Sequence, residues 1–199
     1  MKTFDEYLHD AEIAHGHLCA GQVLGVRMAL LGLRLLGIDD PRGRDRKRTV
    51  TYVEIDRCAT DAIGVVTGCR LGKRALKFRD WGKMAATFID AANDRAVRVS
   101  ARENSKELAR ALHPELDSKN QQQMLAYREL SDADLFDVQW VRVALPPEEM
   151  PGYKGERIAC DLCGEGIAFK REVRRNTQVL CRGCAGERYY TPIEKMRAE

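Results

Sequence analysis

The sequence predicts an α+β fold, with a mainly antiparallel sheet, helices packed on it and a small C-terminal zinc-finger domain. Helical periodicity dominates the first 36 residues and returns near residue 105, whereas the segment between them alternates apolar and polar residues in short runs. Helices, then successive strands with short turns, then helices again favour α+β over a regular βαβ succession. Two CxxC pairs in the last forty residues predict the finger.

The first forty residues predict two helices. Thr3, followed three residues later by Glu6, has the form of a capping box and opens a helix that runs to about Ala14. A more apolar helix covers residues 19–36 and stops before Gly37. Glycines inside this helix each cost about 1 kcal/mol relative to alanine, which predicts close packing against another backbone, with a homodimer seam as one candidate. These glycines are Gly21, Gly25 and Gly32.

The middle of the chain predicts most of the sheet. Residues 42–48 hold five basic side chains in seven and are expected to form a solvated loop. Alternation then predicts four strands, with a short helix over residues 61–68 after the first of them. Short turns between successive strands favour antiparallel pairing. The four strands cover residues 49–55, 75–80, 83–90 and 96–101.

The boundary of the core domain follows two more helices and a final strand. The helices, residues 105–112 and 118–130, are separated by Pro114, and the strand covers residues 137–145. Three prolines within residues 146–151 cannot continue a helix or a central strand. We therefore predict a core domain over residues 1–146, a Pro/Gly linker over 147–157 and a zinc finger over 158–199.

The two CxxC pairs predict a structural zinc site. A two-residue gap lets one tight turn direct both sulfurs to one point, and four thiolates fill the tetrahedral shell of Zn²⁺ without an open position for catalysis. Disulfides, iron–sulfur ligation and redox use of the thiols are the alternatives. Free thiols without a secretory leader predict a reducing, cytoplasmic location. The four ligands are Cys160, Cys163, Cys181 and Cys184.

Residues 158–190 resemble the DksA/TraR type of C4 zinc finger. The resemblance is carried by the cysteine spacing together with Gly164, Ile167 and Arg171. Asn176 departs from that family, which commonly has proline there. Proteins of the family act on RNA polymerase through a separate coiled coil, and this chain has no sustained heptads, so only the finger carries over.

Charge and hydropathy narrow the classes of partner. The net charge is +3, and residues 146–199 hold ten Lys/Arg and nine Asp/Glu, to which a Zn²⁺ with four thiolates adds two negative charges. Nucleic-acid binding is therefore not favoured, although four basic residues in six form a candidate patch for protein or RNA. The most apolar run, residues 20–38, contains Arg27 and Arg34, so we expect no membrane span. The basic residues of the patch are Lys170, Arg171, Arg174 and Arg175.

A second chemical centre is predicted at HGHLC, residues 15–19. His15, His17 and Cys19 are natural ligands of Zn²⁺ and other borderline metals. A cysteine at the start of a helix also favours the thiolate. The alternative is a polar turn beside a buried thiol.

A further cluster follows the first predicted strand. Cys58 can supply another metal ligand, and Asp61 can orient a histidine or accept a proton. Alternatively, Asp61 caps the following helix, Cys69 is a small core residue and Lys73 is a solvated surface charge.

Together these clusters resemble the FmdE family, which takes its name from a component of formylmethanofuran dehydrogenase. The matching segments are HGHLCAGQVLGVRMALLGLRLLGI and EIDRCATDAIGVVTGCRLGKRALKFRDWGKMAATF, and the resemblance covers roughly residues 10–145. It implies an α+β core, often in an intertwined dimer, and in some members a C-terminal zinc finger. Ala20 departs from a position that often holds proline. The shared site that the resemblance implies comprises His17, Cys19, Cys58, Asp61, Cys69 and Lys73.

Three functional hypotheses follow. The preferred one is an accessory, metal-sensing or regulatory homodimer with a structural zinc and a second metal or small-ligand site at His15, His17, Cys19 and Cys58. The second is a metal- or thiol-dependent enzyme of one-carbon metabolism, with Cys19 or Cys58 as nucleophile or ligand, Asp61 as acid or base and Lys73 holding an anionic substrate. The dehydrogenase reaction itself is not expected, because no second cysteine cluster can house iron–sulfur centres. The third is a regulator of transcription whose finger contacts protein or RNA.

Overall fold

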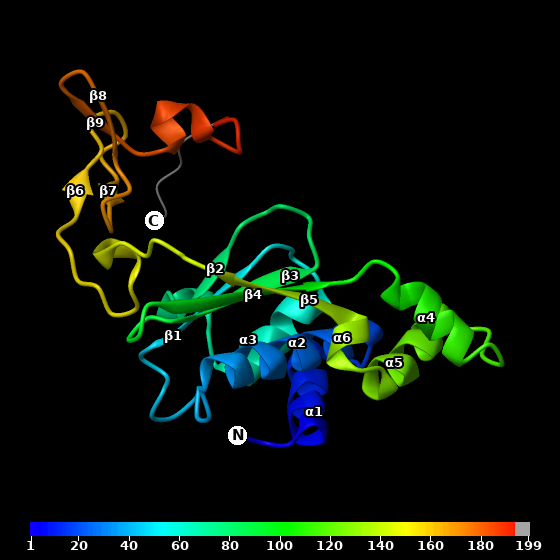
Figure 1. Cartoon of the computed structure of the whole chain (residues 1–199). Coiled ribbons are helices and arrows are strands. Elements are labelled where there is room, and N and C mark those ends of the chain that lie inside the picture. Colours follow the sequence, from blue (N-terminus) through cyan, green and yellow to red (C-terminus); the bar gives the residue numbers. More distant parts are fainter. Residues whose placement is uncertain (194–199) are drawn as a thin grey trace. The chain divides into compact units, whose positions relative to one another are not determined.

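The computed structural model describes residues 1–193, and the chain divides into two compact units, Met1–Leu145 and Pro146–Glu199. The first unit is an α+β domain with a five-stranded sheet, and the second contains two short hairpins (Figure 1). Within the described residues, no helix combines the length and the apolar character that a membrane crossing requires.

Helix α1, Phe4–His15, begins at the predicted capping box. The hydroxyl of Thr3 accepts a hydrogen bond from the backbone N–H of Glu6 at 3.3 Å, and the Thr3 N–H donates to the Glu6 carboxylate at 2.7 Å. The helix ends at Gly16, whose φ of 93° is left-handed and whose N–H donates to the Glu12 carbonyl. Because glycine adopts this conformation without strain, the chain reverses there and starts a second helix.

Helix α2, Ala20–Leu36, is the central helix of the first unit, and its glycines allow close packing within the same chain. A Cβ atom on Gly25 would lie 2.5 Å from the carbonyl oxygen of Ala59, in the neighbouring helix α3, Cys58–Thr67. A Cβ atom on Gly32 would lie 2.1 Å from the ring of Phe88 in the sheet. The backbone predicted to approach these glycines is therefore α3, and the packing does not require a dimer partner.

The sheet has the strand order β2-β1-β3-β4-β5. All neighbouring strands are antiparallel except β1 and β2, which pair in parallel with Thr51 opposite Leu76. The exception arises because α3 and a 3-10 turn, Leu71–Lys73, form a crossover between these two strands. The strands are β1 Thr49–Val53, β2 Leu76–Phe78, β3 Ala85–Asp90, β4 Arg95–Ala101 and β5 Phe136–Val141.

The core lies between the sheet and α2. Helix α2 packs on β3 and β4, and α1 and α3 pack against α2 and against each other. Phe88, Met28 and Leu33 are fully buried. Removing each of these side chains from water contributes about 1.5–3 kcal/mol.

Three helices separate β4 from β5. Helices α4, Ser105–Leu112, and α5, Lys119–Glu129, pack on each other, and α4 ends before Pro114 as predicted. Helix α6, Asp132–Leu135, was not predicted because it is one turn long, and it begins at a capping box of Ser131 and Asp134.

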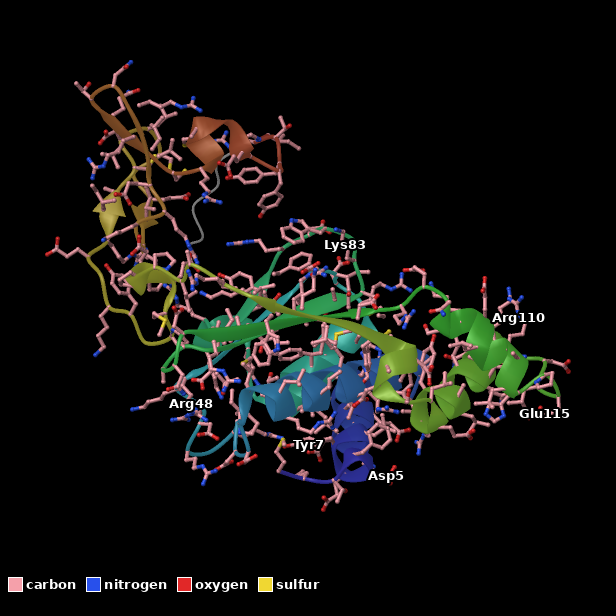
Figure 2. All side chains as sticks on the ribbon, in the orientation of Figure 1. Asp5, Tyr7, Arg48, Lys83, Arg110 and Glu115 are labelled. Carbon is pink, nitrogen blue, oxygen red and sulfur yellow. The ribbon has the colours of Figure 1, made fainter. Side chains whose placement is uncertain are left out.

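The basic loop before β1 is balanced by acidic partners. Arg48 contacts Asp45 at 3.2 Å and Asp90 at 3.4 Å, and Arg42 contacts Asp10 at 3.6 Å. Arg48 and Tyr7, a buried residue of α1, are labelled in Figure 2. These ion pairs reduce the positive field that the loop presents to a nucleic acid.

The second unit begins with a 3-10 turn, Pro147–Glu149, and ends with a helical turn, Gly183–Glu187. Asn176 lies in its second hairpin turn with φ of 52°. Proline is restricted to a φ near −65°, so the departure from the DksA/TraR pattern matches the left-handed conformation of this turn. The strands of the two hairpins are β6 Ile158–Ala159, β7 Gly166–Ile167, β8 Val173–Arg175 and β9 Gln178–Leu180.

Candidate functional sites

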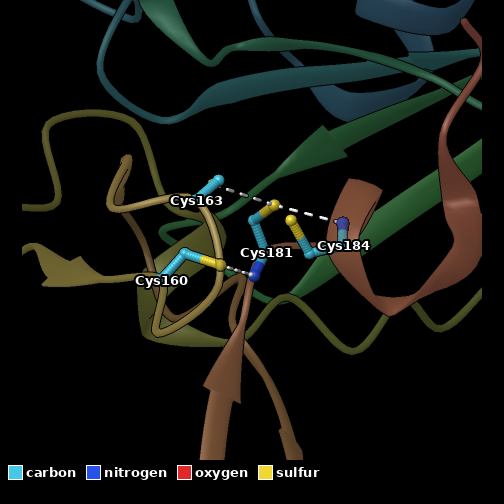
Figure 3. A group of neighbouring side chains, drawn as sticks. All are labelled: Cys160, Cys163, Cys181 and Cys184. Carbon is cyan, nitrogen blue, oxygen red and sulfur yellow. Dashed lines mark hydrogen bonds between the residues drawn. The ribbon is translucent and has the colours of Figure 1, made fainter. Parts of the chain in front are cut away.

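The four cysteines of the second unit form a cluster with the dimensions of a zinc site. Their sulfur atoms all lie within 4.8 Å of one another, and the sulfurs of Cys163 and Cys181 are 4.0 Å apart (Figure 3). Four Zn–S bonds of about 2.3 Å in a tetrahedron place the sulfurs about 3.8 Å apart. The cluster therefore fits Zn²⁺.

Local turns direct the sulfurs to this point. In the first knuckle, the N–H of Gly164 donates to the carbonyl of Cys160 at 2.9 Å, and Gly164 has a left-handed φ of 76°. The N–H of Cys181 donates to the sulfur of Cys160, and the N–H of Cys184 donates to the sulfur of Cys181, both at 3.3 Å. Such hydrogen bonds stabilise thiolates, the form that binds metal.

The electrostatics of the cluster also require a cation. Backbone N–H groups lower the pKa of the Cys160 thiol to about 6. The neighbouring thiols, Cys181 first, and then burial raise the pKa of Cys184 to about 12. One thiolate thus forms readily while a later one is opposed by its neighbours, and Zn²⁺ removes this opposition. Because all four ligands are protein sulfurs, the chain is a zinc-binding protein with a closed, structural site.

The HGHLC segment forms a second cluster, in the first unit. One ligand atom each from His15, His17 and Cys19 lies within 4.8 Å of the others, and the two imidazole rings are 4.6 Å apart. His15 is the last residue of α1 and Cys19 is the N-cap of α2, so the reversal at Gly16 brings the three side chains together. Cys58 is not one of the three ligands of this cluster.

Asp61 orients His15. The Nδ1–H of His15 donates to a carboxylate oxygen of Asp61 at 2.8 Å. Because an ionised carboxylate only accepts hydrogen bonds, this contact places the proton on Nδ1 and leaves Nε2 as a lone-pair donor for a metal. Asp61 does not cap α3, because the N-cap of that helix is Arg57 and the helix begins three residues earlier than predicted.

Cys58, the first residue of α3, lies beside Cys19. A Cβ atom on Gly21 would be 3.0 Å from the Cβ of Cys58 and 3.7 Å from the sulfur of Cys19, so the two cysteines flank the glycine. Burial and a hydrogen bond with the Cys19 thiol raise the pKa of Cys58. Without a metal, Cys58 is therefore a neutral thiol at pH 7, which disagrees with an activated nucleophile.

Both thiols line a cavity of about 500 Å³. Its other walls come from the strand end before α3, the segment that links β4 to α4, and helix α5. Sequence patterns did not reveal the residues on these walls, because they lie up to about a hundred residues from HGHLC and form no local motif. They include Arg57, Arg102, Glu103, Lys106, Asn120 and Tyr127.

Cys69 and Lys73 lie away from this cavity. Cys69 follows the C-terminal end of α3, and the ten residues of that helix span about 15 Å from Cys58. The Cys69 thiol is 2% exposed, accepts from the hydroxyl of Thr51 and donates to the carbonyl of Thr49, each at 3.5 Å. Burial raises its pKa, so Cys69 is a neutral core residue, and Lys73 is exposed beside it.

Comparisons with known proteins agree with this two-part organisation. Residues 14–137 match the family "FmdE, Molybdenum formylmethanofuran dehydrogenase operon", and residues 153–190 match the prokaryotic dksA/traR C4-type zinc finger. A "Probable S-adenosyl-L-methionine-binding protein" of Archaeoglobus fulgidus is 31% identical over 88% of this chain. The match covers 51% of that relative, so the chain spans about half of its length.

A solved structure shares the fold. It is the crystal structure of an FmdE-like protein of the tungsten formylmethanofuran dehydrogenase type, from Syntrophus aciditrophicus. The TM-score is 0.63 at 21% identity, and the alignment covers 96% of each chain. From the matched segment, which spans most of the first unit, we conclude that this chain belongs to the FmdE family.

Proposed function

We propose that the first unit is a metal-dependent small-molecule binding domain with an accessory or sensory role, and that the finger zinc is structural. The observation that carries the proposal is the position of Cys19, which belongs both to the three-ligand cluster and to the wall of the 500 Å³ cavity. A metal held there would be in contact with whatever occupies the cavity.

The ligand set supports this chemistry. Two imidazoles and one thiolate suit Zn²⁺ and other borderline metals, and three protein ligands leave a fourth position for water or a bound molecule. His15, fixed by Asp61, and His17 would hold the metal on one side, and Cys58 offers a second sulfur next to Cys19. The metal would supply a Lewis-acidic attachment point, while the residues of the cavity select the ligand.

S-adenosyl-L-methionine is the first ligand to test. The name of the Archaeoglobus relative states that this compound is bound there, although the chain spans only about half of that protein. A cavity of about 500 Å³ lies in the range of small-molecule sites.

The metal site can be tested by loading the full-length chain with Co²⁺ after metal removal. We expect about two equivalents per chain, each with thiolate-to-cobalt charge-transfer absorption. His15→Ala with His17→Ala should remove the equivalent that belongs to the first unit and leave the finger equivalent. His9→Ala is the matched control, because His9 is exposed on the same helix α1. Equal binding by the wild type and the double variant would reject the core site.

The enzyme hypothesis has less support. The raised pKa of Cys58 opposes its use as a nucleophile, and Lys73, the expected holder of an anionic substrate, is not among the described residues that line the cavity. A role for Asp61 as acid or base competes with its hydrogen bond to His15.

The finger hypothesis also has less support, because three of its four basic residues have partners within the finger unit. Arg175 donates to the carbonyl of Ala185 at 2.6 Å. Arg174 contacts Glu172 at 3.4 Å, and Arg171 contacts Glu149 at 4.0 Å. A partner protein at the finger, the homodimer and the cytoplasmic location stay predictions.

A further inference from the structure

The wall of the core cavity carries more positive than negative charge. Three basic residues, Arg57, Arg102 and Lys106, line it together with a single carboxylate, Glu103. These residues come from the start of α3 and from the segment that leads into α4. At pH 7 the formal charge of the wall is therefore positive.

One of these charges has no partner within the first unit. Glu103 pairs with Lys106 at 3.1 Å, and Arg102 approaches Asp137 at 3.8 Å and donates to the carbonyl of Ala133 at 2.9 Å. Within residues 1–193, Arg57 makes no ion pair or side-chain hydrogen bond. Its guanidinium group can bind a carboxylate or a phosphate through two parallel hydrogen bonds.

Backbone groups add to this positive potential. Helices α2 and α3 both start at the cavity, and neither has a side-chain cap. In the described part of the chain, no acceptor takes the backbone N–H of Gly21 or of Ala59, whereas that of Ala20 donates to the Asn120 side chain at 3.1 Å. Uncapped N–H groups at helix starts attract negative charge.

We infer that the ligand of this cavity carries an acidic group, a carboxylate or a phosphate, and that Arg57 and Lys106 bind that group. The inference rests on the proposed function, because it names the chemical class of the ligand for the same cavity. The thiols on the opposite part of the wall then face the remainder of the ligand. Arg57 is the main determinant, since Lys106 already shares its charge with Glu103.

The test follows backbone amide signals of the full-length chain by NMR at constant ionic strength, with the finger zinc retained. Inorganic phosphate and malonate are the two probes, and they distinguish a phosphate site from a carboxylate site. We expect one or both to shift the amide signals of Gly21 and Ala59 along a saturating curve. Arg57→Met should weaken this binding at least about tenfold, and Lys106→Met by less.

Arg110→Met is the matched control, because Arg110 is an exposed arginine one turn beyond Lys106 on α4 and does not line the cavity (Figure 2). Its binding curve should equal that of the wild type. The amide spectrum of each variant reports at once whether the fold is retained. The absence of a saturable shift with both probes, or equal affinity in Arg57→Met and the wild type, would overturn the inference.

The same titrations with and without Co²⁺ separate this inference from the proposed function. Saturable shifts without a cobalt equivalent in the first unit would support the acidic ligand and reject the metal site. A cobalt equivalent without anion-dependent shifts would support the metal site and reject the acidic ligand.

Discussion

The Nδ1–H of His15 donates to the carboxylate of Asp61 across 2.8 Å, and this contact joins the last residue of α1 to the first turn of α3. The two residues are 46 positions apart in the sequence. A carboxylate that fixes the tautomer and ring orientation of a histidine is the usual outer-shell partner of a metal-binding imidazole. The contact also gives the first prediction.

Asp61→Ala should weaken metal binding in the first unit by about 10- to 100-fold, because His15 loses the group that orients it. The measurement is a competition for Co²⁺ between the protein and a chromophoric chelator. Asp56→Ala is the control, since Asp56 is an exposed carboxylate in the loop before the same helix. An unchanged affinity in Asp61→Ala would remove Asp61 from the site.

Gly25→Ala should destabilise the first unit by about 1–3 kcal/mol, because its methyl group would lie 2.5 Å from the Ala59 carbonyl and force α2 and α3 apart. Urea unfolding measures the change. Gly72→Ala provides the comparison, because a Cβ atom there meets nothing within 4 Å. If both variants were equally stable, α2 and α3 would not pack as closely as the structure indicates.

Asp132→Asn should reveal a pH-dependent contribution to stability. Burial raises the pKa of Asp132, but hydrogen bonds from Arg27 at 2.7 Å and Arg34 at 2.5 Å outweigh it, so the pKa is lowered in the folded state. A lowered pKa stabilises the fold above the unfolded value of about 3.8, and this contribution is lost as the pH falls through the folded value.

The free energy of unfolding should therefore differ between wild type and Asp132→Asn by about 1–2 kcal/mol at pH 7, and the difference should shrink below about pH 4. Unfolding curves between pH 7 and pH 3 test this. Asp117→Asn, at an exposed carboxylate before α5, should show no such trend. A difference that stays constant down to pH 3 would contradict the role of the carboxylate charge.

Cys184→Ser should release the finger zinc and unfold the second unit. The apolar cluster around the metal contains only four buried residues, Cys160, Ile167, Leu180 and Ala185, which is too small a core to fold without it. Metal analysis and limited proteolysis after residue 146 measure the two effects. Cys69→Ser leaves all four ligands in place and should retain the zinc. Retention of zinc by Cys184→Ser would show that the fourth thiolate is dispensable.

Zinc release from the wild type should also depend on pH in one direction. Each ligand must be deprotonated, and the pKa of Cys184 is raised to about 12 in the absence of metal. Protons therefore compete with Zn²⁺, and the apparent affinity should fall as the pH falls. A chelator competition between pH 8 and pH 5 measures this, and a constant affinity across that range would contradict it.

The sequence predicted the elements that depend on local signals. The capping box at Thr3, the reversal at Gly16 and the end of α4 before Pro114 each involve residues a few positions apart. Helix α6 was missed because one turn carries too little periodicity, and the parallel pairing of β1 with β2 was missed because it depends on where α3 crosses the sheet.

The sequence by itself determined the family and both groups of metal-binding residues, because the finger knuckles and HGHLC place their ligands within a few residues of one another. Only the tertiary structure decided which distant groups join Cys19. The close approach of α2 and α3 at Gly21 and Gly25 places Cys58 and Arg57 at the cavity, while the length of α3 takes Cys69 away from it. These contacts depend on how helices pack across long stretches of chain, and no local spacing encodes that packing.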